Sequence, residues 1–461
     1  MEDPGKRDRC AAARTRRVYR LAIIGLIAAT LAACGGGGGA KQTLPTFYPP
    51  DAVVPVSGPD VVGTEGFDAA ISALLKKWNV PGAAVAVARN GKLVLARGYG
   101  YADFENKQVM QPDTMMRIGS VTKVLTAMAI LHLHDRGMLD LDRPFLEILT
   151  QYRVPAGGDA RLNTITLRQL LHHSGGWDRD IKGDPLDLQQ TIAKSLSIPT
   201  PVMCPDVIRY EMEQPLDFAP GTKFVYSNFG YCILAQVVEQ ISGQPVELYV
   251  RDNVLAPMDV HAMSIGYSHL NQRGPRESKY YDYPGAPLVD SVFPGEGKVP
   301  MAYGAFDMMT FSGSGGWIGS AVDLTRVMTA IEGSRMAQFL SAETMTEWLA
   351  NPQLPAWSSD GSWYGLGIFV RLSPERWYHG GSVPGGQTML LRQDNGYVWA
   401  IITNSRTADP DTFSNEMNNA MFQALGNGID GSATDLYALF PSPELPPRTN
   451  RLPAPKSIAA N

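Results

Sequence analysis

The sequence predicts an α/β (α+β) fold in which one antiparallel sheet is flanked by helices and interrupted by an all-α insertion. Strand patterns occur at residues 83–98, near the start of the folded body, and again at 364–403, near its end. Between them, residues 140–315 show mainly the pattern of helices joined by long polar loops. The two groups of strands are therefore expected to join in one sheet.

The first elements follow from local patterns. Residues 67–78 predict a helix, because their apolar positions recur with helical spacing. Residues 83–89 and 92–98 predict two strands, since they flank Asn90-Gly91, a pair typical of tight hairpins. A further amphipathic helix is expected from Ser120 to His134, ending at Gly137.

The later elements are less regular. Helices are expected over 166–171, 231–241, 321–331 and 414–425, and strands over 364–372, 375–378, 388–392 and 397–403. Residues 266–300 carry many Gly and Pro without periodicity, and we expect them to form a long surface excursion.

The N-terminal 33 residues have the features of an export signal. They carry a net charge of +4, and residues 21–33 are almost wholly apolar. Thirteen residues are too few to cross a bilayer, which needs about 20. A basic flank followed by a short apolar segment predicts a signal peptide over 1–33. Residues 15–19 also loosely resemble a twin-arginine signal.

The sequence Leu31-Ala32-Ala33-Cys34 resembles the lipobox of bacterial lipoproteins. This resemblance implies cleavage before Cys34, lipid attachment to that cysteine, and a membrane-anchored protein on the periplasmic side of the envelope. A soluble signal with an incidental cysteine is the alternative. Residues 34–63 are then expected as a flexible tether, 64–430 as the folded domain and 431–461 as a Pro-rich tail.

Composition narrows the functional classes. The chain has 461 residues, 44% of them hydrophobic, which suits a large globular core. Its net charge is −5, so the part after the signal carries −9, which disfavours nucleic-acid binding. Cys204 and Cys232 either pair or remain as buried thiols, and neither has the neighbours of a metal ligand.

Ser120 and Lys123 form the only S-x-x-K in the chain. On a helix, residues three apart share one side, so the lysine amine can reach the serine hydroxyl. A serine becomes a nucleophile when a neighbour takes its proton, and burial lowers the pKa of a lysine enough to do so. The alternative is an N-cap serine followed by a solvated lysine.

Two further groups are candidates for the same site. Tyr226 and Asn228 lie two apart on an extended loop, where a phenol relays a proton and an amide holds a carbonyl. His379-Gly380-Gly381 follows a short predicted strand, and the N–H of Ser382 is expected to form an oxyanion hole with that of Ser120. A core tyrosine and a glycine-rich turn are the alternatives.

With these motifs, the chain resembles the serine β-lactamase and penicillin-binding-protein superfamily, in its branch of class C β-lactamases, DD-peptidases and β-lactamase-like esterases. The S-x-x-K, Y-S-N and H-G-G stand in the family's order, and residues 165–176, 220–222, 257–258 and 315–320 match other landmarks. The resemblance covers residues 65–425. It implies that Ser120 forms the acyl-enzyme and that Lys123 and Tyr226 share acid/base work, without saying which of them deprotonates Ser120. It also implies that Asn228 holds the substrate carbonyl.

The His379-Gly380-Gly381 motif departs from the family, which usually has Lys-Thr-Gly or Lys-Ser-Gly at this position. Histidine is mostly neutral at pH 7, and Gly380 lacks the hydroxyl that binds a substrate carboxylate. We therefore expect an enzyme for esters, amides or D-amino-acid peptides, with slow β-lactam turnover at most.

Other readings compete with this one. A penicillin-binding DD-peptidase or a weak class C-like β-lactamase uses the same residues, and a non-catalytic envelope protein that binds a peptide or glycan is the alternative outside enzymes. No G-x-S-x-G motif supports a Ser-His-Asp hydrolase. A metal site at His172, His173 and Asp178 is disfavoured, and no cofactor is expected. The sequence does not determine the oligomeric state.

Overall fold

The computed structural model describes residues 45–356, 358–426, 429 and 435–444. Within these residues, nine strands form one antiparallel sheet in the order β1-β3-β2-β14-β13-β12-β11-β10, with β4 paired to β3. These strands are β1 (Val56–Ser57), β2 (Gly82–Arg89), β3 (Lys92–Asp103), β4 (Gln108–Val109), β10 (Trp363–Tyr364), β11 (Phe369–Leu372), β12 (Glu375–Val383), β13 (Gly386–Gln393) and β14 (Tyr397–Thr403).

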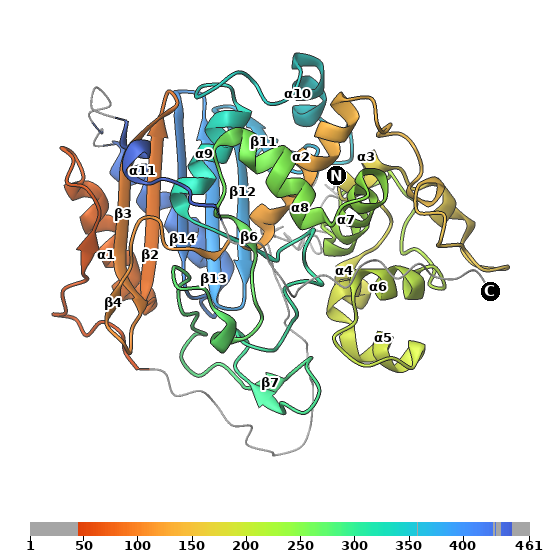
Figure 1. Cartoon of the computed structure of the whole chain (residues 1–461), viewed down its shortest axis with the longest axis horizontal. Helices are drawn as coiled ribbons and strands as arrows, with labels where there is room; N and C mark the ends of the chain where they lie inside the picture. Colours follow the sequence, from red (N-terminus) through yellow and green to blue (C-terminus); the bar gives the residue numbers. More distant parts are fainter. Residues whose placement is uncertain (1–44, 357, 427–428, 430–434, 445–461) are drawn as a thin grey trace, which may run out of the picture.

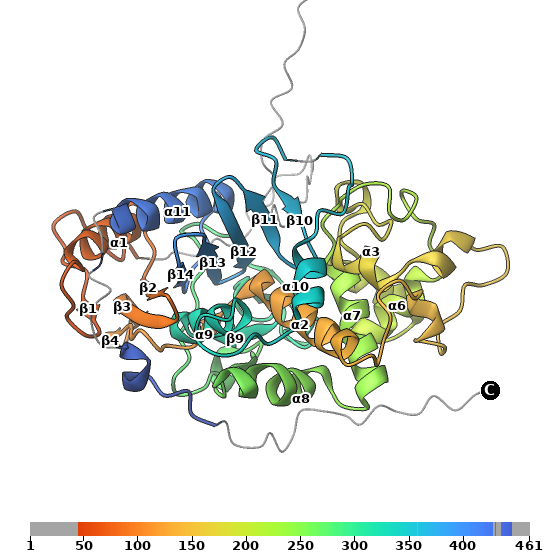
Figure 2. The same cartoon turned by 90° about the horizontal axis from the view of Figure 1, so that it is seen from above.

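Helices cover both faces of this sheet (Figures 1 and 2). On one face lie α1 (Glu65–Trp78) and α11 (Pro410–Gly426), and on the other lie α2 (Thr122–Asp135) and α9 (Ala321–Ile331). Strand β2 shows why two cores form. Its alternate residues Ala84 and Ala86 join the core under α2 and α9, whereas Val85 and Val87 join the core under α1. The predicted fold class is confirmed.

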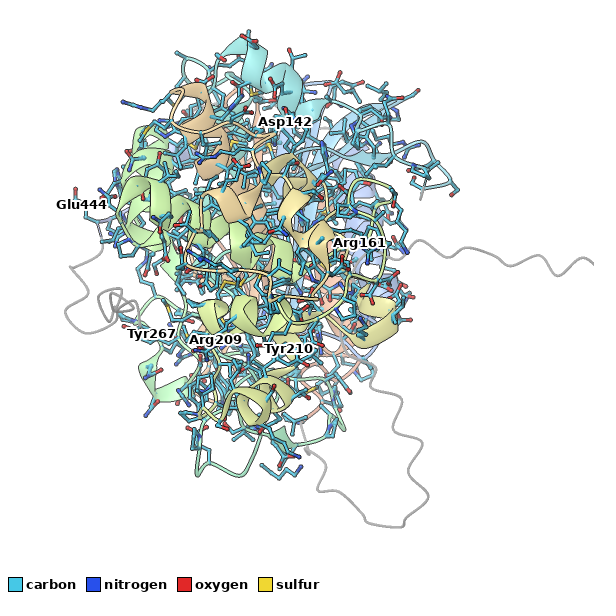
Figure 3. The ribbon with its side chains drawn as sticks, turned by 90° about the vertical axis from the view of Figure 1, so that its right-hand side faces the viewer. Asp142, Arg161, Arg209, Tyr210, Tyr267 and Glu444 are labelled. Atoms are coloured by element: carbon cyan, nitrogen blue, oxygen red, sulfur yellow. A yellow bond between two sulfur atoms is a disulfide. The ribbon has the colours of Figure 1, made fainter. Side chains whose placement is uncertain are left out.

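The segment between the two strand groups forms a helical region beside the sheet (Figure 1). It contains α3 (Leu167–Leu171), α4 (Arg179–Lys182), α5 (Gln189–Leu196), α6 (Cys204–Glu211), α7 (Asn228–Ser242) and α8 (Val246–Val250), and α10 (Ala342–Leu349) lies near it. A disulfide between Cys204 and Cys232 joins α6 to α7. Figure 3 views this region from the side, with Arg161, Arg209 and Tyr210 labelled.

The insertion also contains short strands. β6 (Ser264–Ile265) and β9 (Trp317–Gly319) form a small sheet with β5 (Met116–Arg117), and β7 (Val289–Asp290) pairs with β8 (Lys298–Val299). Because β5 precedes Ser120, this small sheet ties the insertion to the nucleophile.

Arg117 in β5 holds both ends of the segment from Tyr267 to Ala302, which spans nearly all of the excursion predicted over 266–300. Its buried guanidinium donates hydrogen bonds to the carbonyl oxygens of Ala302 (2.6 Å), Pro384 (3.1 Å) and Tyr267 (3.2 Å). The excursion, the β12–β13 turn and the segment before Ser120 are thereby held together, since buried hydrogen bonds to a charged group are costly to break.

Several local expectations hold, and others are wrong. Asn90 and Gly91 both have positive φ, 50° and 80°, as a two-residue hairpin turn requires. The single strand predicted over 364–372 is wrong, because Gly365 donates to the Ile368 carbonyl oxygen and the chain turns there between β10 and β11. The helix expected to begin at Ser120 begins at Thr122, and it is buried on nearly all sides rather than amphipathic.

The two ends of the domain are more ordered than expected. Residues 45–63 are not a flexible tether, because Phe47 and Tyr48 are buried and β1 pairs with β3. Leu436 and Tyr437, expected in the tail, are buried, and Arg326 of α9 donates to the Tyr437 carbonyl oxygen. The signal peptide, Cys34 and residues 445–461 lie outside the described residues. Within the described part, no helix has the length and apolar character needed to span a bilayer.

Candidate active site

Ser120 lies in a short 3₁₀ turn, Gly119–Val121, which leads directly into α2. Its side chain is 5% exposed, so it is buried among its neighbours at the helix N-terminus. Gly119 has φ of +52°, and a Cβ there would lie 2.9 Å from the Ser382 nitrogen. A glycine is therefore required at this position for the turn to approach β12 so closely.

Lys123 lies one turn later and is completely buried. Its Nζ lies 2.8 Å from Asn228 Oδ1, 2.7 Å from the Ser314 carbonyl oxygen and 3.4 Å from Ser120 Oγ. Burial lowers the pKa of Lys123 well below its usual value; Asp184 opposes this shift and Arg179 adds to it. A neutral amine donates to the first two acceptors and keeps a lone pair for the serine proton.

Tyr226 packs beside this amine, with Lys123 Nζ 4.7 Å from the centroid of its ring. Its hydroxyl is buried and has no well-formed hydrogen bond among the described residues. Burial raises the pKa of Tyr226, although the nearby Ser120 hydroxyl acts in the opposite direction. The phenol therefore remains protonated at neutral pH and is a proton donor rather than a resident base.

Asn228 is the first residue of α7, and two neighbours fix it. Ser227 caps the helix by accepting a hydrogen bond from the Gly230 N–H (3.3 Å). Asp184 accepts the Asn228 backbone N–H at 2.5 Å. The Asn228 amide oxygen is thereby held against Lys123.

Asp184 was not expected from the sequence. It is 3% exposed, and burial raises the pKa of its carboxyl, while Arg179 lowers it. It lies just after α4 and 44 residues before Asn228, so no local sequence pattern connects the two. Because its charge raises the pKa of Lys123, it adjusts the proposed base without touching the nucleophile.

His173 also supports the site, as a packing residue. Its Nδ1 accepts the Ser227 N–H at 3.1 Å, and its ring centroid lies 4.2 Å from that of Tyr226. Burial, with a smaller contribution from the nearby Lys123, lowers the pKa of His173 well below its usual value. His172 instead binds the carbonyl oxygens of Tyr364 and Gly365, so the two histidines point to different partners.

The His379-Gly380-Gly381 motif lies within β12 rather than after a short strand. The His379 ring is fully buried, with Nδ1 2.7 Å from the Gly380 carbonyl oxygen and Nε2 2.9 Å from the Tyr364 hydroxyl. Burial, with a smaller contribution from the nearby Lys123, lowers the pKa of His379 to about 3. Both nitrogens are used within the protein, so the ring supplies no cation and no free donor for a substrate.

The backbone of this motif does reach the nucleophile. A Cβ on Gly381 would collide with the Ile118 carbonyl oxygen and lie 3.2 Å from the Ser120 nitrogen. Ser120 and Ser382 therefore bring their backbone nitrogens close together, as the expected oxyanion hole requires. Gly380 and Gly381 contribute by allowing this contact.

The predicted site residues therefore meet in one cluster, which contains Ser120, Lys123, Tyr226, Asn228 and the backbone of Ser382. The His379 side chain, in contrast, is not available to bind a substrate. The described residues contain no group of three or more side chains suited to hold a metal ion. Cys34 lies outside the described residues.

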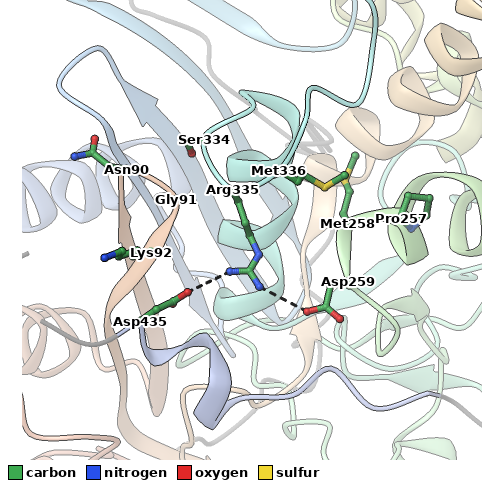
Figure 4. Close-up of a pocket in the computed structure, with 10 residues that line it drawn as sticks. All are labelled: Asn90, Gly91, Lys92, Pro257, Met258, Asp259, Ser334, Arg335, Met336 and Asp435. Carbon is green, nitrogen blue, oxygen red and sulfur yellow. Dashed lines mark hydrogen bonds and ion pairs between the residues drawn. The ribbon is translucent and has the colours of Figure 1, made fainter.

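A separate pocket of about 520 Å³ lies at the β2–β3 turn (Figure 4). Arg335 crosses it, 3.7 Å from Asp259 and 3.5 Å from Asp435, so its charge is already balanced. The pocket shares no residue with the Ser120 cluster, and we assign it no role in the reaction.

A serine beside a buried lysine and a protonated tyrosine is an arrangement typical of serine hydrolases. The Beta-lactamase family model matches residues 67–422, and the chain belongs to this family.

Two relatives extend the comparison. "Putative penicillin-binding protein PbpX" of Bacillus subtilis (strain 168) is 26% identical over 360 residues, or 78% of this chain and 76% of that protein. "Protein flp" of Staphylococcus aureus (strain N315) is 30% identical over 217 residues. That match covers 47% of this chain and only 41% of the relative, so it spans less than half of the relative's length.

Solved structures share the fold. D-amino acid amidase from Ochrobactrum anthropi SV3, complexed with D-phenylalanine, has a TM-score of 0.61 at 20% identity. EstCE1, described as a hydrolase with promiscuous acyltransferase activity, has a TM-score of 0.61 at 19% identity. Each comparison covers 78% of this chain and 98% of the other.

Removal of the lysine amine tests the acid/base assignment. We expect Lys123→Ala to lower kcat for a nitrophenyl ester by about 100- to 10,000-fold, the range for a lost general base. With a p-nitroanilide, whose amine leaving group needs a proton, Tyr226→Phe should cause a loss within the same range if the phenol supplies that proton. Steady-state kinetics check this, with Lys194→Ala, a change at an exposed lysine, as the control. Near-normal turnover in Lys123→Ala would refute the assignment.

Substitution of Asp184 tests whether this carboxylate holds Asn228 in place and adjusts the pKa of Lys123. Asp184→Asn removes a charge that raises the pKa of Lys123, so that pKa should fall further. The acid limb of the pH–kcat profile should therefore move to lower pH, with plateau activity reduced by about tenfold through the weakened Asn228 contact. Asp180→Asn, at an exposed carboxyl of the same loop, is the matched control. An unmoved acid limb would mean that Asp184 has only a structural role.

Proposed function

We propose that the protein hydrolyses esters or amides, including those of D-amino acids, through an acyl-enzyme on Ser120. The observation that carries this proposal is the fully buried Lys123 amine, which lies within hydrogen-bond distance of Ser120 Oγ and Asn228 Oδ1. Beside it, the His379-Gly380-Gly381 motif supplies no cation. The amine supports nucleophilic attack, and the neutral motif disfavours anionic substrates.

The proposed reaction has two halves. Ser120 Oγ transfers its proton to Lys123 Nζ and attacks the substrate carbonyl, whose oxygen accepts hydrogen bonds from the Ser120 and Ser382 N–H groups. Such donors typically contribute about 3 to 4 kcal/mol each to stabilising the oxyanion. The leaving group departs with a proton from Tyr226, which Lys123 restores. Water then attacks the acyl-enzyme with the same groups acting in reverse.

The substrate preference follows from the His379-Gly380-Gly381 motif. A lysine there would attract the carboxylate of a β-lactam or a peptidoglycan stem, whereas the buried His379 is neutral at every physiological pH. The amidase and the esterase-like hydrolase that share this fold support a neutral or amino-acid-derived substrate. The relative PbpX supports the second candidate, a penicillin-binding DD-peptidase or weak β-lactamase.

A comparison of two acylating probes separates the candidates. We expect the body from residue 45 onward to turn over p-nitrophenyl butyrate, with little turnover of benzylpenicillin and no stable adduct by intact mass. Ser120→Ala should abolish the ester reaction. A long-lived penicillin adduct that depends on Ser120 would favour the DD-peptidase, and fast penicillin or nitrocefin hydrolysis would favour the β-lactamase. The absence of labelling at Ser120 by any probe would favour a non-catalytic binding protein.

We also propose that the protein is exported and anchored to the membrane by a lipid on Cys34, on the periplasmic side of the envelope. The short apolar segment over residues 21–33 and the lipobox-like residues before Cys34 support this proposal. The full chain expressed in a bacterium should enter the detergent phase on phase separation and incorporate labelled palmitate. Cys34→Ala should lose both properties, and Cys10→Ala should keep them. Retention of the label in Cys34→Ala would contradict the proposal.

A further inference from the structure

The guanidinium of Arg179 faces the ring of Tyr226. Its central carbon, Cζ, lies 5.7 Å from the centroid of that ring, within the range at which a cation and an aromatic face attract each other. Arg179 is half-buried, so water screens its charge only in part. The arginine charge therefore acts through space on the group that is proposed to supply the proton of the leaving group.

The segment that carries Arg179 is tied to the segment that carries the phenol. Arg179 is the first residue of α4, and the preceding residue, Asp178, accepts a hydrogen bond from Lys223 Nζ at 2.8 Å. At the other end of α4, Lys182 Nζ lies 2.7 Å from Asp217 Oδ1. These contacts join both ends of α4 to the chain before the phenol, so they restrict how far the guanidinium moves relative to it.

Among the described residues, the other titratable groups around Tyr226 do not provide a comparable cation. They are Lys123, His173, Asp184, Tyr231 and Tyr364. Burial lowers the pKa values of Lys123 and His173 well below their usual values, which disfavours their charged forms. Asp184 acts in the sense opposite to Arg179 and raises the pKa of Tyr226. A guanidinium, in contrast, does not lose its proton in a protein.

Protonation of a leaving group creates a negative charge on the phenol. As the bond from the acyl carbon to the leaving oxygen breaks, that oxygen keeps the bonding electrons and takes the Tyr226 proton. A phenolate remains until Lys123 returns a proton. Burial opposes this ion, because it raises the pKa of Tyr226, whereas Arg179 lowers that pKa. The fully buried His379 ring does not help, since its pKa is about 3 and it stays neutral.

We propose that Arg179 is a positioning residue that stabilises the phenolate of Tyr226 and thereby lets the enzyme expel poor leaving groups. This inference rests on the proposed function and extends the role of Tyr226 in the same reaction. A leaving group that needs a proton, such as ethoxide, should then depend on Arg179. A leaving group that departs as a stable anion, such as p-nitrophenolate, should not.

Two butyrate esters test this role, because ethyl butyrate and p-nitrophenyl butyrate share the acyl group and differ only in the leaving group. We expect Arg179→Gln to lower kcat/KM for the ethyl ester by about tenfold, the effect of one partly screened charge, and to change that of the p-nitrophenyl ester by less than about twofold. Rates are compared on the plateau of each pH profile, so that a change in the titration of Lys123 does not contribute. Arg179→Lys should restore most of the ethyl ester rate.

A second cation of the same helix provides the matched control. Lys182→Gln removes a charge from α4 together with its ion pair to Asp217, and it should leave the ratio of the two ester rates unchanged. In a Tyr226→Phe background, Arg179→Gln should cause no further loss with the ethyl ester, because the phenolate is absent. An unchanged ratio in Arg179→Gln, or an additive loss in the double variant, would overturn the proposal.

A titration separates this role from the hydrolase activity. 2,3-Difluorotyrosine placed at position 226 ionises more readily than tyrosine and can be followed by ¹⁹F NMR. Arg179→Gln should lower its ionisation constant by about tenfold, whereas Lys182→Gln should leave it nearly unchanged. If this shift is found but no ester is hydrolysed, the proposed hydrolase activity fails and the effect of Arg179 on Tyr226 stands. If esters are hydrolysed but neither the ratio nor the titration depends on Arg179, the hydrolase stands and this role fails.

Discussion

The burial of one amine, Lys123 Nζ, is the constraint on which the site depends. A lysine in water is protonated at neutral pH and cannot accept a proton from a serine. Here the sheet, α2 and α7 exclude water from the amine, and its acceptors, Asn228 Oδ1 and the Ser314 carbonyl oxygen, need only two donors. The cost of charging a buried amine lowers the pKa of Lys123, and in the proposed mechanism this lets the amine take the Ser120 proton.

The rest of the fold serves that arrangement from several distant segments. Arg117 ties the segment from Tyr267 to Ala302 to the turn that carries Ser120, and the glycines of β12 let two backbones meet where an oxyanion would form. His173 and Asp184 hold the loop that carries Tyr226 and Asn228. The buried His379 completes the packing, so the side chain of this motif is part of the core.

Sequence patterns were informative where the interaction is local. Ser120 and Lys123 are three residues apart on one helix, and Asn90-Gly91 sets its own turn, so both could be predicted. Asp184 could not, because its partner lies 44 residues away, beyond α5 and α6, and no local pattern connects the two. The break between β10 and β11 was missed, because apolar residues continue through a turn that depends on packing against α2 and α10. Buried Phe47 and Tyr48 were missed for a similar reason, since a Pro-rich segment can still dock its aromatic side chains.

The most direct test of this account is the pKa of Lys123 itself. Lysine labelled with ¹³C at the ε-carbon can be followed by NMR during a pH titration, with Lys123→Arg used to assign the signal. We expect one lysine signal that titrates well below the ordinary value of about 10.4 and is lost in Lys123→Arg. If the Lys123 signal titrates with the surface lysines, the amine is charged at neutral pH and cannot be the base that activates Ser120.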